Sequence, residues 1–123
     1  MYLYLASPYS HDNWNIMQAR YAQARDLVAH LLQQNITVFS PIVHCHELAK
    51  VKGMPTDHEF WMTYNFRMLA PARKLLVLML EGWESSKGVA SEIQYARVHG
   101  KPVLLRRPLE IVNNIYSAEE YFA

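Results

Sequence analysis

The chain has a single cysteine, Cys45, among its 123 residues. One cysteine excludes a disulfide within the chain, and this suits the reducing cytoplasm, where we expect the protein to reside. The N-terminus has neither a charged lead-in nor a long apolar core, so no signal peptide is predicted. The longest apolar run, Leu75 to Leu80, is far below the roughly 20 residues that span a bilayer, so we expect no membrane partner.

The chain also lacks an excess of either positive or negative charge. The formal net charge is +1, and the densest basic group is the pair Arg106 and Arg107. A nucleic acid polymer is normally bound by a basic patch, so we do not expect one as a partner. A hydrophobic fraction of 51% and a charged fraction of 19% are typical of a folded protein. The length fits one domain, covering residues 1–123.

Glycine is scarce, with four residues that are widely dispersed. They form neither the glycine-rich turn of dinucleotide enzymes nor the phosphate loop of NTPases. The nucleophile elbow of serine hydrolases, Gly-x-Ser-x-Gly, is absent as well. The segment from His44 to Glu47 contains two histidines and the cysteine, but structural zinc needs four ligands, usually in two separated pairs. We therefore predict neither a metal nor an organic cofactor.

Against these absences stands a regular alternation of strand-like and helix-like segments. Strands are predicted at Tyr2–Ala6, Ile36–Phe39, Leu75–Leu80 and Pro102–Leu105, and helices at 13–34, 56–69 and from about 87 to Gly100. Such alternation predicts an α/β fold with a central parallel sheet of four to five strands and helices on both faces. The apolar run from Leu75 is predicted to be central, because both of its faces are apolar.

Several boundaries depend on local signals. Asn35 is expected to close the first helix in a left-handed conformation. Residues 42–53 are ambiguous, either a loop or a loop with a short helix around 45–51. Thr56 and Glu59 fit a capping box that starts the next helix. Residues 117–120 are a candidate for the start of a last helical turn.

Three loops are expected to converge at one edge of this sheet, because parallel strands end on the same side. They follow the first strand at Ser7 and Tyr9, the second at Ser40, and the third at Gly82. Such loops are either simple connectors or a ligand site. Their aromatic and hydroxyl side chains favour the ligand site, and these are Ser7, Tyr9, Trp14, Trp83, Ser85 and Ser86.

Glu92 is the most informative residue at this edge. It lies early in a helix that follows the apolar third strand, where open α/β sheets bind ligands. Gly88 lies one turn earlier on the same helix face, and the Glu92 carboxylate is expected to lie over it, with room for a substrate. Val89, Ile93 and Ala96 form a separate apolar stripe that faces the sheet. Two interpretations remain open, a ligand-binding carboxylate or a solvated surface glutamate.

Two more polar residues have alternative interpretations. Asn65 shares a helical face with Trp61 and Met68, so its amide is either bonded to backbone in the core or reaches the site and orients Glu92. His44 is either a loop histidine that touches substrate or a solvent-exposed side chain. We carry both forward as candidate site residues.

In the order and spacing of its motifs, the chain resembles the nucleoside 2-deoxyribosyltransferase superfamily, in particular a small bacterial and phage branch. The resemblance covers nearly the whole chain. It rests on the segments 4–10, 38–42 with His44 and His46, Trp61 with Asn65, 82–88 leading to Glu92, and 101–103.

This resemblance implies a flavodoxin-like three-layer sandwich and cleavage or exchange of the N-glycosidic bond of a nucleoside or nucleoside 5′-monophosphate. Glu92 falls at the position of the family nucleophile, and Asn65 is expected to orient it. Ser7, Tyr9, His44, Ser86 and Gly88 are the expected substrate-binding residues. The resemblance also implies a homo-oligomer that completes its pocket with a neighbour, aided by the aromatic tail from Tyr116 to Phe122.

The chain departs from this family pattern at two positions. Relatives carry an aspartate where this chain has Asn65, and often another where it has Arg73. An asparagine holds a hydrogen bond but cannot carry a proton. A non-catalytic nucleotide-binding or regulatory module on the same fold is therefore the alternative hypothesis.

Overall fold

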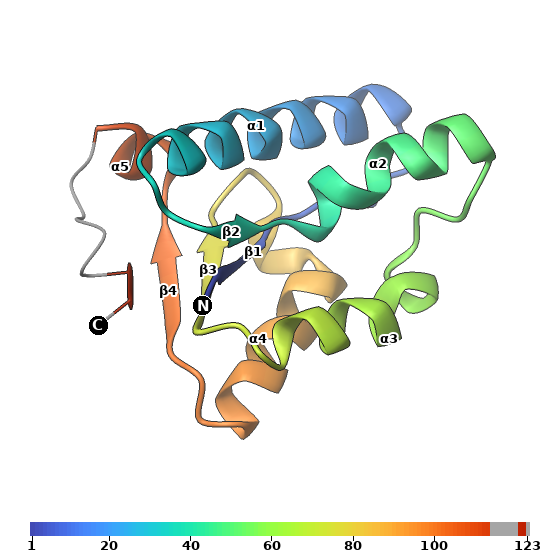
Figure 1. The fold of residues 1–123 in the computed structure, drawn as a ribbon. Coiled ribbons are helices and arrows are strands. Elements are labelled where there is room, and N and C mark those ends of the chain that lie inside the picture. Colours follow the sequence, from blue (N-terminus) through green and yellow to red (C-terminus); the bar gives the residue numbers. More distant parts are fainter. Residues whose placement is uncertain (114–120, 123) are drawn as a thin grey trace.

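The computed structural model describes residues 1–113 and 121–122. Its strands are β1 (Leu3–Ala6), β2 (Val38–Phe39), β3 (Lys74–Leu78) and β4 (Val103–Arg106). Its helices are α1 (Trp14–Gln33), α2 (Pro41–Lys52), α3 (His58–Leu69), α4 (Lys87–Val98) and α5 (Pro108–Val112), with a short 3-10 turn at Trp83–Ser85. Figure 1 shows helices on both sides of the strands.

The four strands form one parallel sheet in the order β2-β1-β3-β4. In the register of the central pair, Leu3 lies opposite Lys74 and Ala6 lies opposite Val77. Every residue of β1 and β3 is buried, which confirms that the apolar run from Leu75 is central. The predicted α/β class and flavodoxin-like sandwich are confirmed. The pairing shortens two predicted strands, since β2 begins at Val38 and β3 ends at Leu78.

Two apolar clusters hold the layers together. On one face of the sheet, α1, α5 and the described tail residues pack on the strands through Leu3, Leu5, Leu27, Leu31, Ile36, Leu76, Leu78, Leu80, Ile111 and Tyr121. On the other face, α3 and α4 pack on the strands through Tyr4, Ala6, Leu69, Ala72, Leu75, Val77, Val89 and Ala96. The predicted stripe on α4 is confirmed, with Val89 and Ala96 buried and Ile93 partly buried.

Side-chain caps define where the helices begin. Asn13, Ser40, Asp57 and Ser86 each accept a hydrogen bond from a backbone amide in the first turn of α1, α2, α3 and α4. Asn35 has a φ of 65°, which confirms the predicted left-handed end of the first helix.

Two local predictions need correction. The ambiguous segment is a full helix, because Ser40 caps it and Pro41 occupies its first position, where no backbone amide is required. The cap of α3 is Asp57 rather than Thr56, since Asp57 accepts from the Phe60 amide. The Thr56 carbonyl instead accepts a hydrogen bond from Ser10 at 2.7 Å, which ties this turn to the loop after β1.

The end of the chain also differs from expectation. Tyr121 is buried in the cluster under α1, and the partly buried Phe122 packs against it, so these two aromatics contact their own domain. Arg73 Nε donates to the Phe122 carbonyl at 3.3 Å, which joins two segments that are distant in the sequence. Tyr116 and the candidate helical turn at 117–120 lie outside the described residues. In the part that is described, none of the helices has the length and apolar character needed to cross a membrane.

Candidate functional site

A cavity of about 370 Å³ opens at the carboxyl edge of the sheet. The loop after β1 contributes Ser7, Tyr9 and Ser10, and α2 contributes Pro41, Ile42 and Cys45. The remaining lining residues come from α3 and its N-terminal turn and from the start of α4, namely Thr56, Asp57, His58, Glu59, Trp61, Asn65, Ser85, Ser86, Lys87, Gly88 and Glu92. The predicted convergence of loops therefore forms one concave site.

Glu92 lies in the wall of this cavity and is only 4% exposed, so it is not a solvated surface glutamate. Burial raises the pKa of its carboxyl to about 7. The nearby Tyr4 hydroxyl opposes this rise in pKa, because its polar O–H group favours the ionised carboxylate. The two groups do not form a hydrogen bond of ordinary geometry. Near neutral pH the site therefore holds a carboxyl group that readily exchanges its proton.

Unsatisfied buried polar atoms gather around this carboxyl. Among the described residues, the buried side-chain atoms without a hydrogen-bond partner include Tyr4 OH, Ser7 Oγ, Asn65 Oδ1 and Glu92 Oε2. Three of these four residues line the cavity, and Tyr4 interacts with Glu92. Unpaired buried polar atoms are costly and rare, so their concentration at one place marks a site that offers hydrogen bonds to a ligand.

Asn65 is 7% exposed and faces the cavity from α3. Of its two predicted environments, the structure therefore shows the one inside the site. Within the described part of the chain, no hydrogen bond joins its amide to Glu92. Direct orientation of Glu92 by Asn65 is thus not visible, and both side chains present polar atoms to the same space.

The N-terminus of α4 forms another wall. Ser86 caps the helix by accepting a hydrogen bond from the Val89 amide at 3.2 Å, and Ser86, Lys87 and Gly88 all line the cavity. The first backbone amides of a helix attract anions and oxygen-rich groups. Ser86 and Gly88 thus lie where the sequence predicted, beside Glu92 on the same helix.

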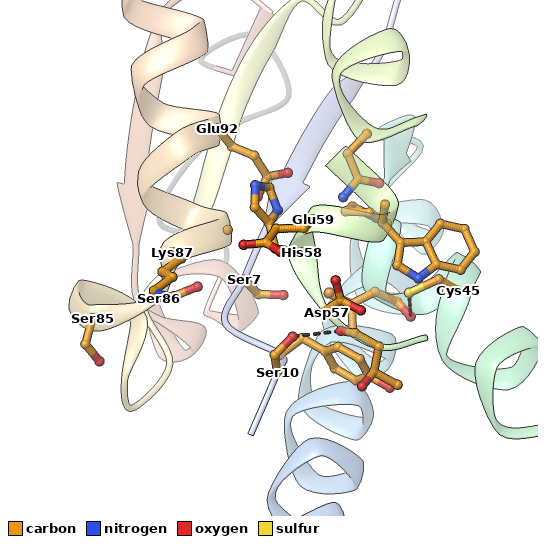
Figure 2. Close-up of a pocket in the computed structure, with 17 residues that line it drawn as sticks. Ser7, Ser10, Cys45, Asp57, His58, Glu59, Ser85, Ser86, Lys87 and Glu92 are labelled. Carbon is orange, nitrogen blue, oxygen red and sulfur yellow. Dashed lines mark hydrogen bonds between the residues drawn. The ribbon is translucent and has the colours of Figure 1, made fainter. Parts of the chain in front are cut away.

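The space above Gly88 was predicted to be open to substrate, but the His58 side chain lies there. A Cβ atom at Gly88 would lie 3.3 Å from His58 Nδ1, so the imidazole of His58, rather than substrate alone, covers this glycine. Figure 2 shows Ser7, His58 and Glu92 directed toward a common space from three different elements. His58 Nε2 contacts Ser91 Oγ at 2.7 Å, and this contact ties α3 to α4.

Tyr9 belongs to a second polar network, behind the cavity. Its hydroxyl lies 2.7 Å from His46 Nδ1, and His46 Nε2 lies 2.9 Å from Gln18 Oε1. The His46 ring is fully buried and stacked between Trp14 and Tyr21. Burial lowers the pKa of His46, and the neutral ring donates to Gln18 and accepts from Tyr9, which fixes Tyr9 in the cavity wall.

His44, the remaining predicted substrate contact, does not line the cavity. Its ring is exposed on α2 and stacks on Tyr64 with ring centroids 5.3 Å apart. The helical form of this segment explains the difference, because His44 and His46 lie on different faces of α2. Across the residues described, no group of three or more His, Cys, Asp or Glu side chains could hold a metal ion.

The other ionisable groups of the cavity give it an acidic character. Asp57, Glu59 and Glu92 line it together with one lysine, Lys87. Burial raises the pKa of the Cys45 thiol to about 11, so this cysteine is a protonated wall residue rather than a nucleophile.

Sequence reasoning missed three residues that shape the site. The sequence identified Tyr4 only as a strand residue. Its hydroxyl is brought next to Glu92 because α4 packs on the face of the sheet to which Tyr4 points. No motif in the sequence singled out His58 for the site, and its place at the first position of α3 opposite Gly88 makes it a wall of the cavity. His46 was noticed only as part of a motif. Its spacing from His44 carried no signal until the helix was known.

The site lies within a single family match. The family model described as Domain of unknown function (DUF1937) matches residues 1–107. The chain belongs to this family. The match covers every residue that lines the cavity, from Ser7 to Glu92. A search of curated proteins returned no match.

Proposed function

We propose that the protein is an N-glycosidase or deoxyribosyltransferase that cleaves or exchanges the N-glycosidic bond of a nucleoside or nucleoside 5′-monophosphate. The observation that carries the proposal is the buried Glu92 carboxyl in the wall of a cavity rich in unpaired polar atoms. When the base departs, positive charge develops on the sugar carbon, and a carboxylate at close range stabilises it or forms a covalent ester.

The pKa of Glu92 suits this role. At about 7, the carboxyl is partly ionised near neutral pH, and burial makes its negative charge poorly solvated. A poorly solvated carboxylate interacts more strongly with a developing cation than a carboxylate in water does. The first step is expected to become faster as pH rises through about 7, because only the ionised form is a nucleophile.

The remaining walls fit the parts of a nucleoside. A volume of about 370 Å³ lies in the range of ordinary small-molecule sites. The rings of Tyr9 and Trp61 offer flat apolar surface for a base, and the Trp61 ring is held by its hydrogen bond to the Pro55 carbonyl at 2.8 Å. Ser7, Ser86 and the first amides of α4 offer partners for sugar hydroxyls or a 5′-phosphate.

The second candidate function is a non-catalytic nucleotide-binding or regulatory module. The Asn65 amide favours it, because this buried residue in the cavity wall cannot transfer a proton to a departing base. A ligand that raises the melting temperature without any turnover in long incubations would select this function.

The test of the first function is base release, followed by chromatography over a panel of 2′-deoxynucleosides, ribonucleosides and their 5′-monophosphates. The wild-type protein is expected to release a base from at least one compound. Glu92→Gln is expected to lower the rate by about 1000-fold or more, because an essential catalytic group is lost. Glu84→Gln is the matched control, because Glu84 is exposed and outside the cavity. Equal release by Glu92→Gln and wild type would remove Glu92 from the reaction.

A homo-oligomer in the cytoplasm is the assembly and location that we propose with this function. Light scattering coupled to size exclusion tests the assembly, and a strictly monomeric protein with full activity would contradict it.

A further inference from the structure

The hydrogen bonds of Ser91 determine where the proton of His58 lies. Ser91 Oγ donates to the Gly88 carbonyl at 3.0 Å and also contacts His58 Nε2 at 2.7 Å. A hydroxyl has one proton, and a carbonyl only accepts, so both contacts are satisfied together when Ser91 accepts from His58. His58 Nε2 therefore carries the proton, and Nδ1 carries the lone pair.

His58 Nδ1 is consequently an acceptor without a partner among the described side chains. It lies over Gly88, 3.3 Å from the place of a Cβ atom, and His58 lines the cavity. Burial lowers the pKa of His58, while Glu59 and Asp57 oppose that effect, so the ring is neutral near neutral pH. The first turn of α3 also disfavours a cation, because a helix N-terminus carries partial positive charge.

The position of this nitrogen relative to Glu92 follows from helix geometry. Gly88 and Glu92 are four residues apart on α4, so they share one face at a separation of about one 5.4 Å turn. The Glu92 side chain leans toward the N-terminus of the helix, which is the side of Gly88 against which the His58 ring packs. Glu92 and His58 thus line the same cavity of about 370 Å³ from two different helices.

We propose that His58 is a catalytic base that deprotonates the attacking water through Nδ1, and that Ser91 is a positioning residue that fixes its tautomer. This inference rests on the proposed function. The water oxygen bonds to the anomeric carbon while the ester bond between that carbon and Glu92 breaks, and the electron pair returns to the carboxylate. The proton of the water moves to His58 Nδ1, and the imidazolium then releases a proton to solvent.

His58 acts only in the second half of the reaction, the hydrolysis of the ester. Its role can therefore be measured separately from the role of Glu92. Base release in the first turnover needs Glu92 but not His58, whereas later turnovers need both. The experiment follows single-turnover and steady-state release of base by rapid quench, using the 2′-deoxynucleoside or 5′-monophosphate that wild type cleaves fastest. Intact-protein mass measures the glycosyl-enzyme ester.

Two substitutions separate proton transfer from hydrogen bonding. His58→Gln keeps an amide within reach of Ser91 but removes the acceptor at Nδ1. His58→Asn keeps an acceptor close to Nδ1 but cannot carry a proton. Both are expected to keep the first-turnover rate, to lower steady-state turnover at least 100-fold, and to accumulate the ester, because general base catalysis contributes roughly 100- to 10,000-fold. His99→Gln is the matched control, because His99 is exposed at the far end of α4.

Rescue by azide and the pH dependence of the rate distinguish proton transfer by His58 from a purely structural role of this residue. Azide needs no deprotonation, so it is expected to restore turnover in both His58 variants and to form a glycosyl azide. The steady-state rate of wild type is expected to rise with pH through the pKa of His58. This rising part of the pH–rate profile is expected to be absent in His58→Asn. The other titratable or charged groups that line this cavity are Tyr9, Cys45, Asp57, Glu59, Lys87 and Glu92. The part of the pH dependence that is due to Glu92 also appears in the first-turnover rate, and this distinguishes it from the part due to His58.

Ser91→Ala tests the positioning role. It removes the acceptor that holds the proton on Nε2, and we expect a several-fold lower steady-state rate with an unchanged first turnover. Loss of both phases in the His58 variants, or failure of azide to restore turnover, would overturn the role of His58 while leaving Glu92 in place. Absence of base release by wild type over the whole panel would overturn both proposals.

Discussion

The two faces of the sheet are built from the same strands but serve different purposes. On the side of α1 and α5, the strands contribute leucines such as Leu5 and Leu76, and the cluster there is entirely apolar apart from the Tyr121 hydroxyl. On the side of α3 and α4, the core includes the Tyr4 hydroxyl, and it continues into a cavity that contains Asn65 and Glu92.

This difference separates stability from chemistry. The leucine face gains free energy from burying apolar area, and the Tyr121 hydroxyl is the one polar side-chain group among its described residues. The other face carries a buried carboxyl with a raised pKa and several unpaired polar atoms, each of which costs stability. Substitutions on the two faces are therefore expected to change stability in opposite directions.

Leu76→Ala tests the apolar face and is expected to have the largest effect on stability. Leu76 is fully buried in β3, so its truncation leaves a cavity and lowers the free energy of unfolding by about 2–5 kcal/mol. Denaturant titration measures the change. Base release by the folded fraction is expected to stay near the wild-type value, and a selective loss of turnover would show that the two faces are coupled.

Glu92→Gln tests the other face and is expected to stabilise the protein above neutral pH. The folded-state pKa of Glu92, about 7, lies above its ordinary value of 4.5. Its contribution to stability is therefore fully present below about pH 4.5 and is lost as pH rises through about 7. At 1.36 kcal/mol per unit of pKa, the loss at pH 8 is about 3 kcal/mol at most.

The measurement is the free energy of unfolding of wild type and Glu92→Gln from pH 4 to pH 8. The two proteins are expected to diverge as pH rises, with the variant more stable at pH 8. Parallel curves would mean that the carboxyl is solvated in the folded protein. Glu84→Gln serves again as the control, because its side chain is exposed.

Gly88→Ala is expected to have the smallest effect on stability, although the added methyl group lies in the wall of the cavity. Alanine suits the helical backbone better than glycine, but its Cβ would lie 3.3 Å from His58 Nδ1 and would displace that ring. We expect a change in unfolding free energy below about 1 kcal/mol and a several-fold loss of steady-state turnover.

Gly100→Ala provides the contrast for that substitution. Gly100 has a φ of +67° and open space around it, so alanine there strains the backbone by about 1–2 kcal/mol without touching the cavity. Its turnover is expected to equal that of wild type. A fall in turnover of the same size for both variants would show that Gly88→Ala acts through stability rather than through His58.

Local signals predicted the parallel sheet, the central strand and the helix that carries Glu92, because hydrophobic periodicity reports directly on which residues are buried. They left α2 ambiguous, as a loop with or without a short helix around 45–51, because Pro41 was not interpreted as the first residue of a helix. That error also affected the site, since the helix turns His44 outward and buries His46.

The sequence by itself determined that Glu92 follows a buried strand and shares a helix face with Gly88, because both facts depend only on spacing along the chain. Tertiary structure alone decided what surrounds them. Residues far apart in sequence, Tyr4 on β1 and His58 on α3, become neighbours of α4 only when the helix packs on the sheet. That packing removes water from the carboxyl, which raises its pKa, and gives His58 the partner that determines the position of its proton.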